Sequence, residues 1–283
     1  MDIRGTDSGI SQRDYETFRD YLEDVCGIVL GDNKHYLVSS RLGRLMQEHS
    51  IRSVGELVAN LKDNPGSVFQ ERIIDAMTTN ETSWFRDNHP YEALTQHVFP
   101  ELGGKRIRDI RMWSAACSSG QEPYSISITV QEFFRLRPGM ITNVQIVGTD
   151  ISPSMLKIAR EGVFDENSLR RGMSDDRRKQ HFRQTGEQWK LKNEIQSRVT
   201  FREINLLKDF SSIGKFDCIF CRNVLIYFSP DVKRDIIRRL SAALKPEGYL
   251  ILGGSESIAN YSTDFATVRF QNGLLYKKKP DAG

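Results

Sequence analysis

The sequence of 283 residues predicts an α/β protein with an N-terminal all-α domain and a doubly wound parallel sheet that carries a small inserted antiparallel β subdomain. Three observations predict this. Residues 1–80 show helical periodicity without strand-like alternation, short apolar strands alternate with helices after residue 105, and a charged stretch at about 165–198 interrupts the alternation. We therefore expect domains at 1–80 and 106–283, joined by a linker over 81–105 with a break at Asn88-His89-Pro90 and a short helix at 91–98.

Four helices are expected in the N-terminal domain. Ser11 can cap the first helix, and Ser53 with Glu56 resembles the capping box of the third. The second helix begins near Asn33, and the fourth covers about 66–79. The sequence of this domain contains no internal repeat.

Basic residues share one flank of the second helix. Lys34, Arg41 and Arg44 are spaced by seven and three residues, so they lie apart from its apolar face. This flank is either a solvated face or a docking surface for an acidic partner.

The charge of the chain is unevenly distributed. Residues 1–80 carry 9 Lys and Arg against 13 Asp and Glu, whereas the rest of the chain carries 31 against 24. This asymmetry indicates two domains and an acidic partner for the larger one. It is too small to imply nucleic acid as the partner, since DNA-binding domains are more basic and more clustered in charge.

The larger domain is predicted to contain five strands and a terminal hairpin. The strands are expected at 110–116, 144–149, 199–204, 216–221 and 249–252, and the hairpin at 268–276 with its turn at Asn272-Gly273. Strands that alternate with helices form a parallel sheet covered by helices on both faces. Ligands bind such sheets at the carboxyl ends of the strands, so residues that follow the strands are the candidate site.

The charged stretch at about 165–198 is expected to be a helical segment followed by a small hairpin. Thr185-Gly186-Glu187 is typical of a tight turn between short strands. The stretch is either a solvated loop or a contact surface for a partner, since long insertions are often functional.

The first two strands end in residues suited to a nucleoside-type ligand. The loop at 115–123 is rich in small residues and precedes a helix N-terminus. Glu122 in this loop would repel a phosphate, which favours a cationic or amine-bearing ligand. Asp150 ends the second strand, where an acid accepts hydrogen bonds from ribose hydroxyls, although it could instead cap the helix at Ser152.

The next two strands also end in polar residues. Asn205-Leu206 could hold an adenine edge, or Asn205 could form a turn. Arg222-Asn223 follows an apolar strand and is expected to face the cleft. Tyr227 could offer its hydroxyl to a reaction centre or simply pack.

Membrane and metal chemistry are not expected. The longest stretch without a charge has twelve residues, from Pro138 to Thr149, and is too short to span a bilayer. The N-terminus has no signal-peptide pattern, and four scattered cysteines make no disulfide framework, so we expect a cytoplasmic protein. Cys218 and Cys221 have no second pair that would complete a zinc site.

Three segments resemble the CheR-type family of chemotaxis receptor methyltransferases. Residues 80–87, NETSWFRD, are similar to the family segment N-E-T-x-F-F-R-[DE]. Residues 116–125, ACSSGQEPYS, are similar to A-C-S-T-G-E-E-P-Y-S, and residues 220–228, FCRNVLIYF, to F-C-R-N-V-x-I-Y-F. The resemblance runs in order over about 11–278, and the departures are Trp84, Ser119 and Gln121.

The resemblance implies a Rossmann-like methyltransferase that uses S-adenosylmethionine and releases S-adenosylhomocysteine. By matching positions, it implies a cofactor site lined by Asn80, Thr82, Arg86, Glu122, Asp150, Asn205, Leu206, Arg222 and Asn223. Arg86 and Tyr227 would lie near the transferred methyl group. The implied acceptor is a glutamate side chain on the cytoplasmic helical bundle of a chemoreceptor, on which Lys34, Arg41 and Arg44 would dock.

Two other functions are compatible with such a sequence. One is a non-catalytic scaffold that senses the cofactor on receptor arrays. The other is a methyltransferase with a different acceptor. Enzymes that methylate nucleic-acid amino groups often carry [DN]-P-P-[YF] after the fourth strand, and this chain has Arg222-Asn223-Val224-Leu225 there.

Overall fold

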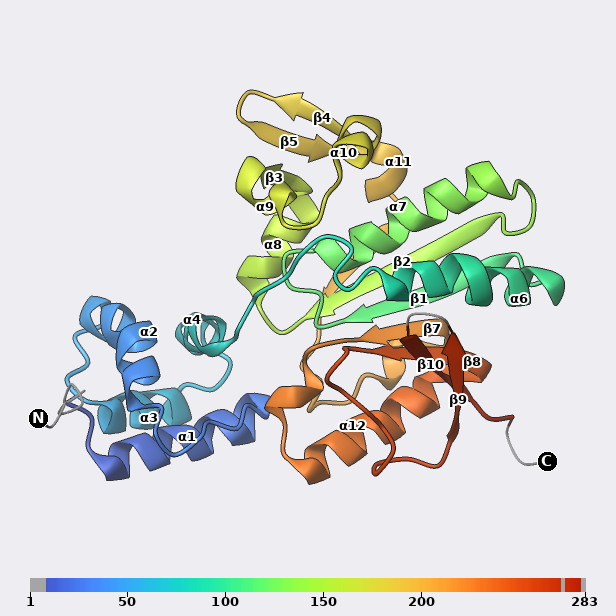
Figure 1. Ribbon diagram of the computed structural model, residues 1–283. Coiled ribbons are helices and arrows are strands. Elements are labelled where there is room, and N and C mark those ends of the chain that lie inside the picture. The colour runs from blue at the N-terminus through green and yellow to red at the C-terminus, as the bar shows by residue number, and fades with distance from the viewer. Residues whose placement is uncertain (1–8, 271–272, 281–283) are drawn as a thin grey trace, which may run out of the picture. The chain divides into compact units, whose positions relative to one another are not determined.

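The computed structural model describes residues 9–270 and 273–280. These residues divide into two compact units, whose helices and strands are labelled in Figure 1. One unit contains the N-terminal residues as far as Thr79 together with residues 227–232. The other contains residues 80–226 and the chain from residue 233 onward.

Residues 9–79 form four helices in the described part of the chain. They are α1 (Gln12–Cys26), α2 (His35–Glu48), α3 (Val54–Asp63) and α4 (Val68–Met77). Ser11 caps α1 as predicted, and Ser53 accepts a hydrogen bond from the Glu56 N–H at the start of α3. The apolar faces bring α1 against α3 and α2 against α4.

The larger unit is built on a seven-stranded mixed sheet with the order β6-β2-β1-β7-β8-β10-β9. Its strands are β1 (Asp109–Ala115), β2 (Asn143–Asp150), β6 (Val199–Glu203), β7 (Phe216–Cys221), β8 (Leu244–Leu252), β9 (Phe265–Phe270) and β10 (Gly273–Lys278). The first five of these pair in parallel, and β10 pairs antiparallel with β8 and β9. The predicted fold class is confirmed. The predicted hairpin turn includes Asn272, which lies outside the described residues.

The strand order reverses between β1 and β7, and this creates the site. From β1 the chain proceeds through β2 to β6 on one side, then returns to β7 and β8 on the other. The loops that leave β1 and β7 therefore diverge, and ligands of doubly wound sheets bind in the crevice between such loops. The connecting helices are α7 (Gln121–Leu136), α8 (Pro153–Glu161) and α12 (Pro230–Ala243), with short 3₁₀ turns η2 (Ser211–Ile213) and η3 (Leu225–Tyr227).

Side chains of β1 alternate between two packed faces of the sheet. Ile110 and Met112 lie in a core cluster with the apolar residues of α7. Trp113 points to the other face, where its ring lies 5.1 Å from that of Phe210 and 5.6 Å from that of Phe216, centroid to centroid. Burial on both faces explains why apolar side chains occupy neighbouring positions of this strand, such as Met112 and Trp113.

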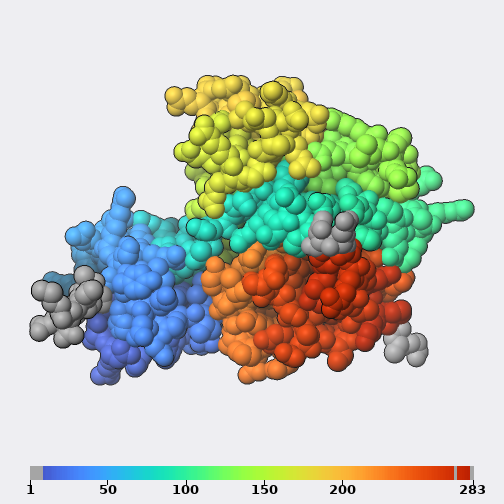
Figure 2. Space-filling model, viewed as in Figure 1, coloured from blue at the N-terminus to red at the C-terminus, as the bar shows by residue number. Residues whose placement is uncertain are grey.

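Residues 81–105 contain more helix than the short one predicted at 91–98 within the linker. They include α5 (His89–Ala93), the π-helical η1 (Leu94–Val98) and α6 (Phe99–Gly104). Tyr91, Leu94, Val98 and Leu102 are spaced by three or four residues, so they share one helical face, and all are buried in the sheet core. In Figure 2 this teal segment lies between the yellow inserted segment and the orange and red strands.

The inserted segment has its own three-stranded antiparallel sheet with the order β3-β5-β4. Its elements are β3 (Val163–Asp165), α9 (Glu166–Arg170), α10 (Asp175–His181), β4 (Phe182–Thr185), β5 (Gln188–Leu191) and α11 (Asn193–Gln196). The predicted hairpin is β4 and β5, and Gly186 at its turn has a φ of 62°. The sheet also takes β3 from before the predicted stretch.

The described residues also show whether a helix could span a membrane and where the cysteine side chains lie. In the described part of the chain, no helix is long and apolar enough to cross a membrane. Cys117, Cys218 and Cys221 are buried free thiols, and burial raises the pKa of each well above its usual range. A protonated thiol is a poor nucleophile. All three side chains are buried and pack in the interior of the larger unit.

Candidate active site

Two strained loops meet where the strand order reverses. The loop after β1 has positive φ at Ala116 (59°), Ser118 (49°) and Gly120 (94°), and the loop after β7 has positive φ at Asn223 (57°). Gly120 is needed for a second reason, since an added Cβ would lie 3.0 Å from the Cβ of Ala159. Backbone strain of this kind gathers at functional sites when the surrounding structure holds it in place.

Arg222 joins three segments that are far apart in the sequence. Its Nη1 donates to Glu122 Oε2 at 3.0 Å, and its Nη2 donates to Asp87 Oδ2 at 2.5 Å and to the Arg86 carbonyl at 3.1 Å. The side chain is only 1% exposed. A buried guanidinium with two carboxylate partners fixes the loop after β7, the start of α7 and the Arg86 segment in one arrangement.

Glu122 is therefore less available than the sequence suggests. Its Oε1 accepts from Ser114 Oγ at 2.7 Å, while its Oε2 accepts from Arg222. Burial raises the pKa of Glu122, and the positive charge of Arg222 opposes that rise. The carboxylate is thus held as one half of an ion pair.

Asp150 holds the crevice loops through backbone contacts. Its Oδ2 accepts from the Ser118 N–H at 2.7 Å, and its Oδ1 accepts from the Ser152 N–H at 2.9 Å. Asp150 is not the N-cap of α8, because Ser152 caps that helix by accepting from the Met155 N–H. Each carboxylate oxygen can accept more than one hydrogen bond, so ribose contacts remain compatible with this geometry.

Glu256 organises the loop after β7 and was missed by sequence reasoning. Its Oε2 accepts from the N–H groups of Asn223 (2.7 Å) and Gly253 (2.8 Å), and its Oε1 accepts from those of Val224 (3.0 Å) and Ile226 (3.3 Å). The carboxylate thereby holds Asn223 in its left-handed conformation. Glu256 lies 33 residues from Asn223 along the chain, and only its position near the end of the fifth parallel strand could have signalled it.

We expect Glu256→Gln to destabilise the chain by about 2–3 kcal/mol, because the amide nitrogen would face two backbone donors that then lack an acceptor. Urea denaturation of the variant measures this. Glu187→Gln, at an exposed hairpin turn, is the matched control and should change the free energy of unfolding by less than about 0.5 kcal/mol. Equal stability of the two variants would contradict the assigned role of Glu256.

The residues after β6 combine a turn with an apolar wall. Asn205 Oδ1 accepts from the Leu207 N–H at 2.9 Å, which forms the turn that the sequence allowed. Leu206 is buried, and its carbonyl accepts from Arg239 Nη2 at 2.6 Å. Their position after β6 is consistent with the adenine wall inferred from the sequence.

The segment that contains Asn80, Thr82 and Arg86 belongs to the same unit as these loops. The Asn80 carbonyl accepts from Ser118 Oγ at 2.9 Å, which ties the segment to the loop after β1. Thr82 and Arg86 are half-buried. The Arg86 side chain has a long contact of 3.5 Å from Nη1 to the Glu81 carbonyl, so it can turn toward a ligand at little cost.

Comparison with known proteins identifies the family. Residues 13–78 match the all-alpha domain of CheR methyltransferase, and residues 80–274 match the SAM binding domain of CheR methyltransferase. The chain belongs to the CheR methyltransferase family. The resemblance drawn from the three sequence segments is confirmed.

Relatives of this CheR chain match it over nearly its whole length. It is 51% identical to chemotaxis protein methyltransferase 1 of Pseudomonas aeruginosa over 272 residues, which cover 94% of this chain and 98% of the relative. It is 48% identical, with the same coverage, to chemotaxis protein methyltransferase Cher2 of Pseudomonas putida. It is 45% identical to chemotaxis protein methyltransferase 1 of Vibrio cholerae, with 95% and 98% covered.

Tyr227, the other residue predicted near the methyl group, lies at the end of η3. It falls in the stretch 227–232 that groups with the N-terminal helices. Its carbonyl accepts from the Val29 N–H at 2.9 Å, and its side chain is half-buried. The structure thus assigns Tyr227 and Arg86 to different units of this CheR protein.

The predicted basic flank of α2 divides into two kinds of residue. Arg41 Nη1 donates to the carbonyls of Met77 (2.7 Å) and Thr78 (3.1 Å), at the end of α4. Arg44 is 89% exposed and pairs with Glu48, while Lys34 is exposed at the start of α2. A cation at a helix C-terminus is stabilising, so Arg41 joins two helices while Arg44 and Lys34 remain at the surface.

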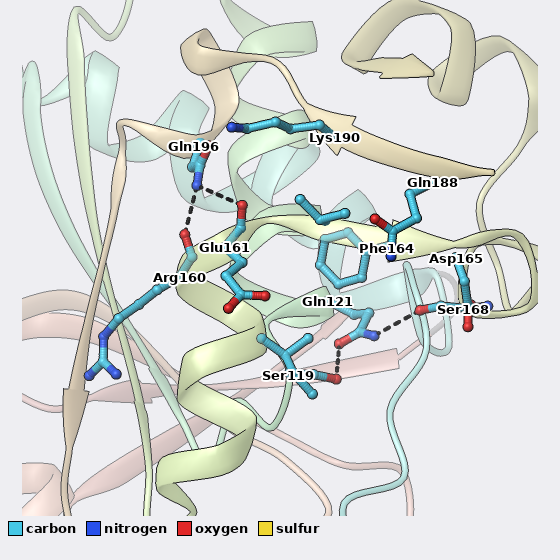
Figure 3. A pocket seen from close by; sticks show the side chains of 12 residues that line it. Ser119, Gln121, Arg160, Glu161, Phe164, Asp165, Ser168, Gln188, Lys190 and Gln196 are labelled. Carbon is cyan, nitrogen blue, oxygen red and sulfur yellow. Dashed lines mark hydrogen bonds between the residues drawn. The ribbon is translucent and has the colours of Figure 1, made fainter. Parts of the chain in front are cut away.

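A polar groove of about 770 Å³ lies between the loop after β1, the end of α8 and the inserted segment. Figure 3 shows Ser119 and Gln121 on one wall, with Gln121 Nε2 donating to Ser168 Oγ at 3.3 Å. Gln188 and Lys190 of β5 form another part of the lining. None of the residues predicted to bind the cofactor lines this groove, although its lining residue Gln121 directly precedes one of them, Glu122.

Proposed function

We propose that this chain transfers the methyl group of S-adenosylmethionine to glutamate side chains of chemoreceptor cytoplasmic domains, forming methyl esters that serve sensory adaptation in the cytoplasm. The observation that carries the proposal is the buried Arg222, which links all three family segments at the point where the strand order reverses. Membership of the CheR family and the chemotaxis names of its relatives support the same reaction.

The crevice offers polar atoms that fit the cofactor. Asn223 Oδ1 and Arg222 Nε are buried and have no hydrogen-bond partner among the residues that the structure describes. Buried polar atoms without partners are rare in proteins, and a bound ligand is one way to satisfy them. Both atoms belong to residues at the end of β7, where ligands of this fold bind.

The residues of the crevice would hold different parts of the cofactor. Asp150 would accept hydrogen bonds from the ribose hydroxyls, and Asn205 with Leu206 would border the adenine ring. Glu122, paired with Arg222, would supply negative charge for the cationic end. The remaining residues proposed to line the cofactor are Asn80, Thr82, Arg86 and Asn223.

When bound, the cofactor supplies an electrophilic methyl group on a sulfonium that is its own leaving group. The acceptor glutamate is already ionised near neutral pH, so no side chain must act as a general base. Arg86 would hold the acceptor carboxylate through its fixed positive charge. The role of Tyr227 near the methyl group rests on the family resemblance alone. Alignment and exclusion of water can supply about 7–11 kcal/mol, which explains the small number of catalytic side chains.

The acceptor glutamates would lie on the acidic helical bundle of the receptor. The exposed charges of Lys34 and Arg44 suit an acidic partner, because complementary charge speeds encounter and fixes orientation. Arg41 would contribute mainly by fixing α2 on α4, as its hydrogen bonds indicate.

Transfer of a labelled methyl group from S-adenosylmethionine tests the proposal. The full chain is incubated with purified receptor cytoplasmic fragments from the same cell, and in parallel with RNA and DNA. We expect label on receptor fragments alone. Label on nucleic acid would mean that the acceptor is not a receptor glutamate. Cofactor binding without transfer to any fragment would favour the non-catalytic scaffold. Either result would contradict the proposal.

A further inference from the structure

The inserted segment is packed onto the segment that carries Arg86. The Trp84 N–H donates to the Arg171 carbonyl at 2.8 Å, and the Trp84 ring meets those of Phe164 and Phe182 edge-on at 4.9 and 5.4 Å. An added Cβ on Gly172 would lie 2.1 Å from the Trp84 carbonyl oxygen. The inserted segment and Trp84 thus form one tightly packed body.

The next residue, Phe85, has an unusual backbone that neighbours must hold in place. Its φ is 47°, which is disfavoured for a bulky residue. Its N–H donates to Ser125 Oγ of α7 at 3.0 Å, and its ring is buried. The Arg177 guanidinium of α10 lies 3.8 Å from the centre of that ring, within the range of a cation–π contact.

Arg177 is itself fixed by a carboxylate on α7. Its Nε and Nη2 donate to the two oxygens of Glu132 at 2.8 and 2.9 Å. His181 is fully buried, with its Nε2 3.9 Å from Glu132 Oε1. Burial lowers the pKa of His181, so the neutral imidazole leaves Glu132 to Arg177. The guanidinium is therefore held in one orientation over Phe85.

Arg86 follows Phe85 directly, and its backbone is fixed from both sides. On one side stands the Arg177–Phe85 contact, and on the other Arg222 binds the Arg86 carbonyl. The Arg86 side chain has little to restrain it, so its backbone decides where the guanidinium can reach. A shift of about 1 Å in a positioning group can cost 10²-fold in rate.

We propose that Arg177 is a positioning residue for methyl transfer, which places Arg86 by holding Phe85 from the inserted segment. The inference rests on the proposed function of Arg86. It gives the inserted segment a role in the reaction itself, in addition to any contact with a partner.

A double-mutant cycle on kcat tests this with the full chain and a receptor fragment. We expect Arg177→Met to lower kcat by about 10- to 100-fold, with the Kd for S-adenosylhomocysteine changed by less than about threefold. In the Arg86→Ala background the same substitution should lower kcat by less than about twofold, because Arg177 acts through Arg86. Arg177→Lys, which keeps the charge but not the planar fork, should fall between wild type and Arg177→Met.

Lys179→Met is the matched control, because Lys179 is exposed on the same helix, two residues away. It should leave kcat unchanged. If Arg177→Met does not fold, Glu132→Gln replaces it in the cycle. Equal losses in the wild-type and Arg86→Ala backgrounds would reduce Arg177 to a structural role and overturn the inference. Failure of the wild-type chain to methylate any fragment would overturn the proposed function first, and this inference with it.

Discussion

Replacement of Arg86 by alanine is expected to lower kcat for methyl transfer by about 10²–10³-fold, because the fixed charge that orients the acceptor carboxylate for attack on the methyl group is lost. The Arg86 backbone is held by Arg222, while its side chain is half-buried and weakly bonded. The substitution should therefore remove the charge without disturbing the fold. Steady-state transfer to a receptor fragment measures the effect.

Cys117→Ala is the control for this prediction. Cys117 lies buried in the loop after β1, and burial raises the pKa of its thiol, which disfavours the thiolate form that a nucleophile needs. We expect Cys117→Ala to lose far less rate than Arg86→Ala. Equal losses for the two variants would mean that both act through local packing, and the role of Arg86 would then be rejected.

Replacement of Arg222 by alanine is expected to cost about 3–5 kcal/mol of unfolding free energy, because it leaves buried Glu122 without its charge partner. The Arg222 side chain is 1% exposed, so water cannot replace the lost hydrogen bonds. The loop after β7 would also lose its hydrogen bonds to Glu122 and to the Arg86 segment, so the affinity for the cofactor should fall. Urea denaturation and calorimetric titration with S-adenosylhomocysteine measure the two effects.

Arg238→Ala provides the comparison for Arg222→Ala. Arg238 pairs with Asp235 but is 68% exposed, and such surface pairs contribute about 0–1 kcal/mol. If the two variants unfold at the same urea concentration, Arg222 does not hold the crevice together. Addition of Glu122→Gln to Arg222→Ala should recover part of the lost stability, since the uncompensated buried charge is then removed.

The strands and the loops that follow them could be predicted because they depend on local patterns. Apolar strands that alternate with helices require a parallel sheet, and such a sheet places Glu122, Asp150 and Arg222 at one edge. The Glu122–Arg222 pair could not be predicted, since its members lie 100 residues apart and many charges could have been partners. The role of Glu256 could not be predicted for the same reason, since it lies 33 residues from Asn223 along the chain.

Tertiary contacts decided two other features. The flank of α2 reads as one stripe in the sequence, but Arg41 lies near the end of α4 and binds its carbonyls. After the break at Asn88-His89-Pro90 the sequence predicts one short helix at 91–98, whereas the helical residues run from His89 to Gly104 and pack against the sheet. The length of this helical segment depends on its burial against the sheet, which the turn signal does not show.

The chemical identity of the transferred label tests the central claim most directly. Receptor fragments labelled by this protein would be treated with mild base, and volatile radioactivity would be collected as methanol. A carboxyl methyl ester hydrolyses under these conditions, so the account predicts that nearly all label is released. Label that stays on the protein after base would mean a methylated nitrogen or another stable acceptor, and it would contradict the assignment of glutamate as the substrate.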